Sequence, residues 1–190
     1  MKRAVTLALM ITLILCVLPS CSVGEGQSDA ERIREKYSAC GGVKMNMTLT
    51  ADYGERVYEF KARFSGTGKS GTLEILAPEN IKGLTVAFTE EGGRLEADGV
   101  SFDTGALFGN GLSPAEAAPL MLSAWESGYA FERASETVSG EAAAALTFDL
   151  DNGAILKTWF DRKTLLPIKA EISENGYTVL TAVFGDVILE

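Results

Sequence analysis

Alternation of apolar and polar residues along short segments constrains this chain more than any other feature. From Val43 to Tyr53 every second residue is apolar, and the residues between them are polar. A period of two is the pattern of a strand with one buried face. The pattern recurs in further segments, which we expect to be strands around residues 57–64, 73–77, 84–88, 95, 100–102, 129–138, 143–150, 154–161, 166–173 and 177–189.

Turn signals separate these segments. Asn152-Gly153 and Asn175-Gly176 are each flanked by alternating runs, and an Asn-Gly pair suits the tight turn of a two-residue hairpin. Strands joined by such turns pair in antiparallel fashion with their neighbours in sequence. The sequence therefore predicts about ten or eleven short antiparallel strands in a strongly curved sheet or a barrel.

A helix is expected before the first strand. Ser28 and Glu31 have the spacing of a capping box, and the helix would end at the glycine pair 41–42. Its apolar stripe would consist of Ile33, Tyr37 and Cys40. A short amphipathic helix of this kind packs on another element.

A second helix is expected between two groups of strands. Ser113, Pro114 and Glu116 form another capping signal with proline in the first turn. Pro119 complicates this interpretation, because a proline inside a helix costs about 3 kcal/mol. The helix therefore begins either at Pro114 or at Pro119, and in both cases it is apolar.

The N-terminus has the features of an export signal. Lys2 and Arg3 form a basic start, and residues 4–18 form an apolar run that is short for a permanent membrane span. The sequence Leu-Pro-Ser-Cys that ends at Cys21 is similar to a bacterial lipobox, in which Cys21 would receive a diacylglyceryl group with acyl chains such as palmitate. The alternative is an ordinary signal peptide with a cysteine near its cleavage site.

These features divide the chain into three parts. We expect residues 1–20 to be a lipoprotein signal peptide, residues 21–27 to be a lipidated N-terminus with a flexible tether, and residues 28–190 to form one domain. The domain would then lie outside the cytoplasm, anchored to the cell membrane by its acyl chains. In a Gram-negative host, Ser22 after the lipidated cysteine would permit sorting to the outer membrane.

Charge and cysteine content narrow the range of partners. A net charge of −9 argues against nucleic acid as a partner, and it gains nothing from anionic lipid headgroups, so the acyl chains must hold the domain. With Cys21 modified and Cys16 removed with the signal, Cys40 has no unmodified partner in the chain. We expect an inert thiol at Cys40 rather than a bridge to another chain.

Absence of histidine limits the chemistry, because it excludes Ser-His-Asp and Cys-His catalysis and most zinc sites. Residues 66–70 are similar to the end of a phosphate-binding loop, but Arg63 replaces a required glycine, so a hairpin loop is favoured. Residues 149–153 are similar to a calcium loop, but Phe160 replaces its bidentate glutamate, so a tight turn is favoured. The sequence predicts a protein that is not an enzyme and needs no cofactor or metal.

One apolar stripe has two interpretations. It consists of Met45, Met47, Tyr58, Phe60 and Phe64. It is either a packed core or the lining of an apolar cavity, which methionine and aromatic side chains would suit. Periodicity does not distinguish the two, and both stay open at this point.

Several segments resemble the LolA/LolB-like lipoprotein-sorting proteins, a family related to the anti-sigma-factor regulator RseB, to mycobacterial LppX and to the clostridial spore-germination lipoprotein GerS. The similar segments are a strand, proline and turn at 64–81, a hairpin at 95–100, the helix at 113–125 and a closing hairpin at 159–169. Together the resemblance covers residues 28–189. This chain differs from the family at Ala77, where the sorting carriers have an arginine that helps control lid closure.

The resemblance implies an α+β fold that is mainly β: an open or half β-barrel of about eleven antiparallel strands covered by helices. Its concave face would hold acyl chains through burial of apolar area, and the departure at Ala77 disfavours a switching release mechanism. The cavity would be lined by Met45, Met47, Leu49, Tyr58, Phe60, Phe64, Leu84, Val86 and Phe88. The lid would consist of Leu120, Met121 and Trp125.

Two functions are therefore compatible with the sequence. In the first, a tethered, non-enzymatic domain holds a lipid or an acylated ligand such as a lipoprotein in the cavity. In the second, which the resemblance to GerS implies, the core is filled and the domain is an interaction scaffold. The scaffold would bind a cell-envelope enzyme through its surface or an edge strand.

Overall fold

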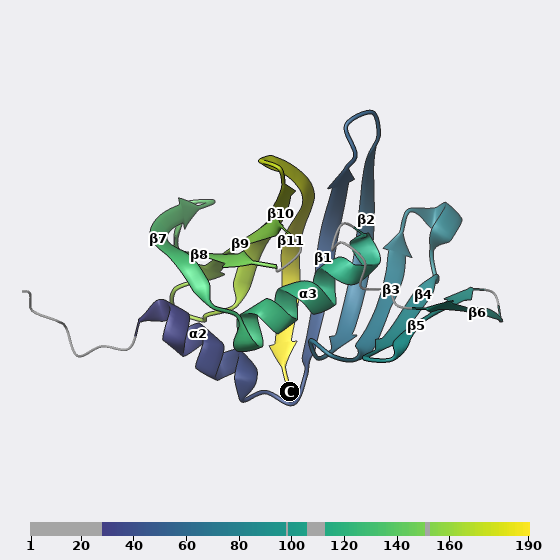
Figure 1. The fold of residues 1–190 in the computed structure, drawn as a ribbon, viewed down its shortest axis with the longest axis horizontal. Helices are drawn as coiled ribbons and strands as arrows, with labels where there is room; N and C mark the ends of the chain where they lie inside the picture. Colours follow the sequence, from purple (N-terminus) through teal and green to yellow (C-terminus); the bar gives the residue numbers. More distant parts are fainter. Residues whose placement is uncertain (1–27, 98, 106–112, 151–152) are drawn as a thin grey trace, which may run out of the picture.

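Eleven antiparallel strands form one continuous sheet in the computed structural model, which describes residues 28–97, 99–105, 113–150 and 153–190 (Figure 1). The strands are β1 (Val43–Asp52), β2 (Val57–Gly66), β3 (Gly71–Ala77), β4 (Thr85–Thr89), β5 (Gly92–Ala97), β6 (Val100–Gly105), β7 (Ala130–Val138), β8 (Glu141–Asp149), β9 (Ala154–Asp161), β10 (Pro167–Glu174) and β11 (Tyr177–Leu189). Their order across the sheet is β6-β5-β4-β3-β2-β1-β11-β10-β9-β8-β7.

Pairing of the first strand with the last joins two runs of sequential hairpins into this sheet. β1 pairs with β11 from Val43 opposite Leu189 to Ala51 opposite Leu180. β6 and β7 do not pair with each other and remain the two edges, so the sheet is open rather than a closed barrel. The predicted α+β fold with an open half-barrel is therefore confirmed.

Helix α2 (Asp29–Ser38) begins with the predicted capping box. The Ser28 backbone N–H donates to Glu31 Oε2 at 2.9 Å, and the Glu31 N–H donates to Ser28 Oγ at 3.3 Å. Two residues of the predicted stripe, Ile33 and Tyr37, are buried, while Cys40 lies half-buried just after the helix.

Helix α3 (Pro114–Ser127) begins at the first of its two predicted starts. Ser113 caps it by accepting a hydrogen bond from the Ala115 N–H at 3.3 Å, and the helix continues through Pro119. A single turn of 3-10 helix, η1 (Glu79–Ile81), follows β3. None of the helices in the described ranges is both long enough and apolar enough to span a membrane.

Helix α3 crosses one face of the sheet in front of β11, β1 and β2, and α2 lies against its C-terminal end (Figure 1). The buried residues of both helices and of this sheet face form one hydrophobic core. Its described members, with the partly buried residues packed against them, lie between Ala30 and Leu189, so a polypeptide from Ser22 onward contains all of them.

Predicted turns have mixed outcomes. Asn175 and Gly176 have φ values of 51° and 81°, as a two-residue hairpin of type I′ requires, so this turn is confirmed. Residues 66–70 connect β2 to β3, which confirms the hairpin loop. Residues 151–152 lie outside the described part of the chain, as do the predicted signal peptide, Cys21 and the tether.

Candidate functional site

Strand register places the predicted cavity residues on one side of the sheet, the concave face that α3 crosses. Residues directly opposite each other in paired strands point to the same side, and Met45 lies opposite Phe64, which lies opposite Leu73. Leu49 lies opposite Phe60 in the same way. The nine predicted residues differ in burial, however, and this divides the concave face into a covered part and an uncovered part.

The covered part includes the centre of this face, which α3 crosses. Its predicted members are almost completely buried: Met45, Met47, Leu49, Phe64, Val86 and Phe88. Phe64 and Phe88 stack with their ring centroids 5.9 Å apart. These six side chains are part of the packed core in this structure.

The three predicted lid residues lie on α3, as the sequence suggested. Met121 and Trp125 are buried, and Leu120 is half-buried. Trp125 contacts the rings of Tyr37, Phe160 and Phe184 at centroid distances of 5.3 Å, 5.4 Å and 5.6 Å. Its indole N–H donates to the buried Thr158 Oγ1 at 3.0 Å. The C-terminal half of α3 is therefore fixed in place by a dense aromatic cluster with a satisfied polar group.

The hairpin loop at 66–70 also holds α3. A Cβ atom on Gly68 would lie only 2.8 Å from the Ser123 Cα atom, so the loop backbone touches the helix backbone. The Gly68 N–H donates to Glu126 Oε1 at 3.3 Å. Burial raises the pKa of the Glu126 carboxyl group, while this hydrogen bond acts in the opposite direction. Only glycine at position 68 permits this close approach of the loop backbone to the α3 backbone.

The uncovered part begins at the tip of the β1–β2 hairpin. Tyr53, Tyr58 and Phe60 form a ladder with 6.3 Å between successive ring centroids. Tyr58 lies opposite Ala51, so the ladder belongs to the concave face. Tyr53 and Tyr58 are 50% and 41% exposed, and Phe60 is half-buried.

The uncovered part also includes two residues of β6, at the edge of the sheet. Phe102 lies opposite Leu95, and Leu95 lies opposite Val86 of the core, so Phe102 faces the concave side. Val100 lies on the same side, opposite Ala97. Val100 and Phe102 are 51% and 59% exposed.

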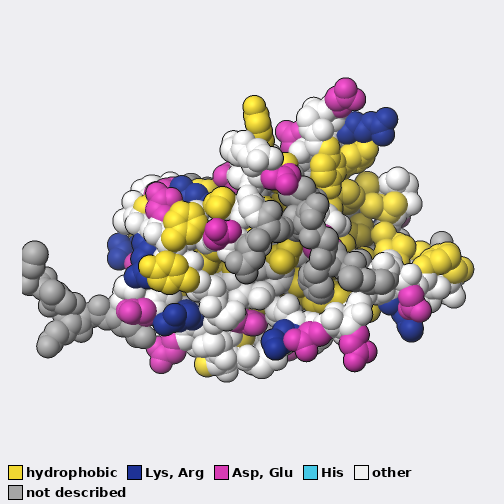
Figure 2. All heavy atoms as spheres, in the orientation of Figure 1, with side chains coloured by type: hydrophobic (Ala, Val, Ile, Leu, Met, Phe, Trp, Pro, Cys, Tyr) yellow, Lys and Arg dark blue, Asp and Glu magenta, His cyan; other side chains and the backbone are white. Residues whose placement is uncertain are grey.

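We call these five residues, together with the half-buried Leu84 in the segment before β4, the open apolar strip: Tyr53, Tyr58, Phe60, Leu84, Val100 and Phe102. Figure 2 shows hydrophobic atoms gathered below the tip of the β1–β2 hairpin and toward β6. Large apolar side chains that are exposed on one face of a protein are typical of binding surfaces. Three of the predicted lining residues, Tyr58, Phe60 and Leu84, belong to the strip.

Sequence reasoning did not include Tyr53, Val100 and Phe102 in the site. All three nevertheless continue the alternation that predicted the other lining residues. The alternation shows which side of a strand a residue occupies, but not where the covering helix ends. That boundary separates the open strip from the core, and it depends on the position of α3.

Reactive groups are few in the described part of the chain. Within its ranges no three potential metal ligands among Asp, Glu and Cys lie close enough together to hold an ion. Cys40 is a free thiol that donates to the Tyr37 carbonyl oxygen at 3.0 Å, and burial raises the pKa of this thiol. A thiol with a raised pKa is a poor nucleophile at neutral pH.

Comparisons with known proteins agree on the fold. No family model matches the chain, and no curated protein sequence matches it. An uncharacterised conserved protein from Thermus thermophilus has the same fold with a TM-score of 0.52 and 10% identity, over 86% of this chain and 88% of that one.

Two further solved structures are similar at lower scores. A LolA-superfamily protein from Nitrosomonas europaea has a TM-score of 0.44 and 13% identity, over 86% of this chain and 94% of that one. A MucA/MucB complex from Pseudomonas aeruginosa has a TM-score of 0.46 and 12% identity, over 85% of this chain and 56% of that one. At such identities the likenesses concern the fold alone.

Proposed function

We propose that this protein is a membrane-anchored, non-enzymatic lipoprotein of the cell envelope that holds an acyl chain on the concave face of its half-barrel. The open apolar strip is the observation that supports this proposal. Four of its six side chains are exposed and two are half-buried, although the core residues of the same face are buried. An acyl chain laid along the strip would remove this apolar area from water without any covalent chemistry.

The packed residues under α3 are not accessible to a ligand in this conformation. Met45, Met47 and Phe64 continue the strip beneath the helix. They would contact a ligand only if α3 moved away, and the aromatic cluster around Trp125 opposes this movement at the C-terminal half of the helix. The strip alone is therefore the binding surface for a ligand that enters this conformation.

Anchoring belongs to the same proposal. A diacylglyceryl group at Cys21 would hold the domain at the outer side of a membrane, with residues 22–27 as a tether. A tether of six residues reaches at most about 20 Å. The strip would then work close to a membrane surface, where acyl chains are available.

Neutral long-chain alcohols test the apolar binding step without involving charge. The protein from Ser22 onward is titrated with 1-octanol, 1-nonanol and 1-decanol. Each added methylene should improve the dissociation constant about fourfold, since burial of one methylene contributes about 0.8 kcal/mol. An affinity that does not change with chain length would contradict the proposal.

A pair of variants locates the binding surface. Phe60→Asp places a carboxylate in the strip and should weaken 1-decanol binding by at least about tenfold. Val183→Asp is the matched control, because Val183 is an exposed apolar residue opposite Lys169 on the convex face. If a folded Phe60→Asp protein bound 1-decanol as the unmodified protein does, the strip would not be the site.

The interaction scaffold is the second candidate, and the free edge of β7 favours it. β7 has nine residues, most of them exposed, and its Phe131 is an exposed aromatic residue. A partner strand could add to such an edge. The scaffold predicts one stoichiometric envelope protein that binds the unmodified domain but not a Phe131→Asp variant, together with no dependence on alcohol chain length.

A further inference from the structure

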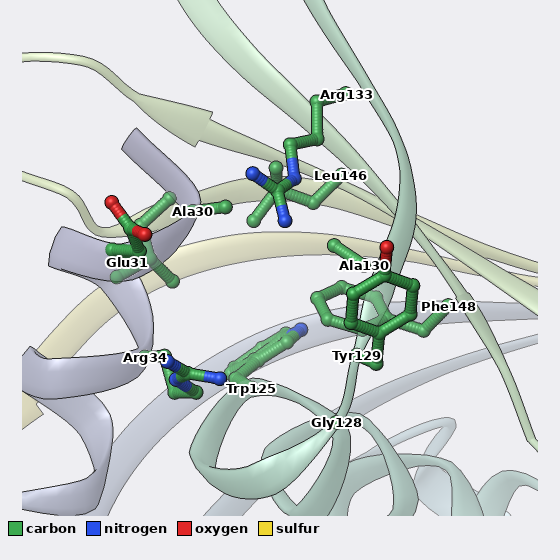
Figure 3. Close-up of a pocket in the computed structure, with 11 residues that line it drawn as sticks. Ala30, Glu31, Arg34, Trp125, Gly128, Tyr129, Ala130, Arg133, Leu146 and Phe148 are labelled. Carbon is green, nitrogen blue, oxygen red and sulfur yellow. The ribbon is translucent and has the colours of Figure 1, made fainter. Parts of the chain in front are cut away.

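A second candidate site lies at the opposite end of α3, where α2, α3, β7 and β8 meet. A pocket of about 190 Å³ opens there (Figure 3). Its apolar floor includes Trp125, Leu146 and Phe148, which are buried core residues. Tyr129 stands at the rim with 74% of its surface exposed.

Two arginines from different elements line this pocket. Figure 3 shows the Arg133 guanidinium reaching from β7 over the pocket toward Ala30 and Leu146. Arg34 approaches from α2 on the side of Trp125. The fold thus brings two positive groups to one small opening in a chain whose net charge is −9.

Neither guanidinium has an ion-pair partner within 4.0 Å in the described part of the chain. Four other described arginines do have one: Arg32, Arg63, Arg94 and Arg162. Arg34 and Arg133 therefore keep their hydrogen-bond donors available, and two guanidinium groups that face one opening repel each other until an anion binds between them.

Glu31 is the acidic group at the same pocket, and it is engaged elsewhere. Its Oε2 atom accepts from the Ser28 N–H and from Ser28 Oγ, which closes the capping box of α2. The hydrogen bonds from Ser28 lower the pKa of Glu31 most, and Arg133 and Arg34 lower it further, so both arginines act on this corner of the molecule. One carboxylate leaves a surplus of one positive charge.

We propose that this arginine pocket binds one anionic group, a carboxylate or a phosphate, that is attached to a short apolar stem. The guanidinium groups of Arg34 and Arg133 would hold the anion, and the stem would lie on Trp125, Leu146 and Phe148. The pocket is too small for a drug-sized molecule, so the ligand is a short organic acid or the headgroup end of a lipid. This site is separate from the open apolar strip, and its test does not depend on the proposed function.

Tryptophan signals give a local readout for this proposal. The chain has two tryptophans, and only Trp125 lines the pocket. Trp159 packs with Ala143 and Ala145 in a second cluster. Its neighbour in the strand, Thr158, contacts Trp125 on the concave side, so Trp159 points to the opposite side of the sheet. Binding should therefore shift the indole ¹H–¹⁵N signal of Trp125 and leave that of Trp159 unchanged.

Four probes distinguish the sources of the ligand. The protein from Ser22 onward is titrated with hexanoate, 1-hexanol, monomeric dihexanoylphosphatidylglycerol and inorganic phosphate. Hexanoate should bind at least about tenfold more tightly than 1-hexanol, and phosphate alone should bind more weakly than the probes that carry a stem. Tighter binding of hexanoate than of the phospholipid would indicate a free acid, and the reverse would indicate a lipid headgroup.

Charge variants decide the outcome. Arg133→Gln and Arg34→Gln should each weaken hexanoate binding about tenfold or more, whereas Arg94→Gln, which makes the same charge change on β5, should have no effect. Phe60→Asp should also leave hexanoate binding unchanged, because Phe60 belongs to the open apolar strip and not to the arginine pocket. Equal binding of hexanoate and 1-hexanol, equal effects of the three arginine variants, or no shift of Trp125 with any probe would each overturn the proposal.

Discussion

Tyr37 shows how one residue of α2 connects the helices to the sheet. Its ring contacts Trp125 of α3 and Phe160 of β9 at centroid distances of 5.3 Å and 6.0 Å. Its hydroxyl group donates to the Leu165 carbonyl oxygen at 3.4 Å, which is a long hydrogen bond. The side chain is completely buried, so the neutral phenol is strongly favoured over the phenolate.

This burial predicts a loss of stability at alkaline pH. Desolvation raises the pKa of Tyr37 far above its usual value near 10. Above about pH 10 the unfolded chain releases the Tyr37 proton and the folded chain keeps it, so the free energy of unfolding falls as pH rises. The contribution of Tyr37 should be as large as about 1.4 kcal/mol per pH unit.

Urea unfolding between pH 9 and pH 11 measures this effect. The Cys40→Ser background removes a half-buried thiol whose pKa is also raised by burial. Tyr37→Phe should flatten the alkaline decline, while Tyr177→Phe, at an exposed tyrosine, should leave it unchanged. An equal decline in the Tyr37→Phe protein would show that another group causes it.

At the scale of elements, the sequence predicted where the strands lie better than it predicted which strand residues are covered by a helix. Alternation located the segments that became strands, and the predicted range 154–161 coincides with β9. The start of α3 had two interpretations, since Pro119 opposes a helix that the Ser113 cap favours; packing against the core resolved this in favour of Pro114. The limit of the open apolar strip could not be predicted, because it depends on where α3 lies on the sheet.

The position of α3 depends on the contact between Gly68 and Ser123, which only glycine allows. Gly68→Ala would place a Cβ atom 2.8 Å from the Ser123 Cα atom, so the loop at 66–70 must move away from the helix. The hydrogen bond from the Gly68 N–H to Glu126 would also be lost or lengthened. We expect a destabilisation of about 1–3 kcal/mol and faster hydrogen exchange in α3.

Gly185→Ala is the matched control for this element. A Cβ atom at Gly185 would lie 3.6 Å from its nearest neighbour, an ordinary contact, on β11 away from α3. It should leave the exchange rates of α3 unchanged. Equal exchange in α3 for both variants would show that the loop does not hold the helix.

At the scale of the whole molecule, the two candidate sites lie on different halves of the fold. The open apolar strip belongs to β2 and β6, with the β1–β2 turn and the segment before β4, whereas the arginine pocket belongs to α2, α3, β7 and β8. α3 connects them, because it covers the centre of the concave face and ends at the pocket (Figure 1). The described chain begins at Ser28, beside the pocket, because Ser28 donates hydrogen bonds to the lining residue Glu31.

Anchoring through Cys21 is testable on the complete chain in its host. Thioether formation needs the thiol of one particular cysteine, and two acyl chains give stable membrane attachment where one chain gives only reversible binding. Cys21→Ser should therefore abolish incorporation of an alkyne-labelled palmitate analogue. Cys16→Ser and Cys40→Ser remove the other two cysteines one at a time and should keep the label. Label retained after Cys21→Ser, or lost after Cys40→Ser, would place the lipid elsewhere in the chain and contradict anchoring through Cys21.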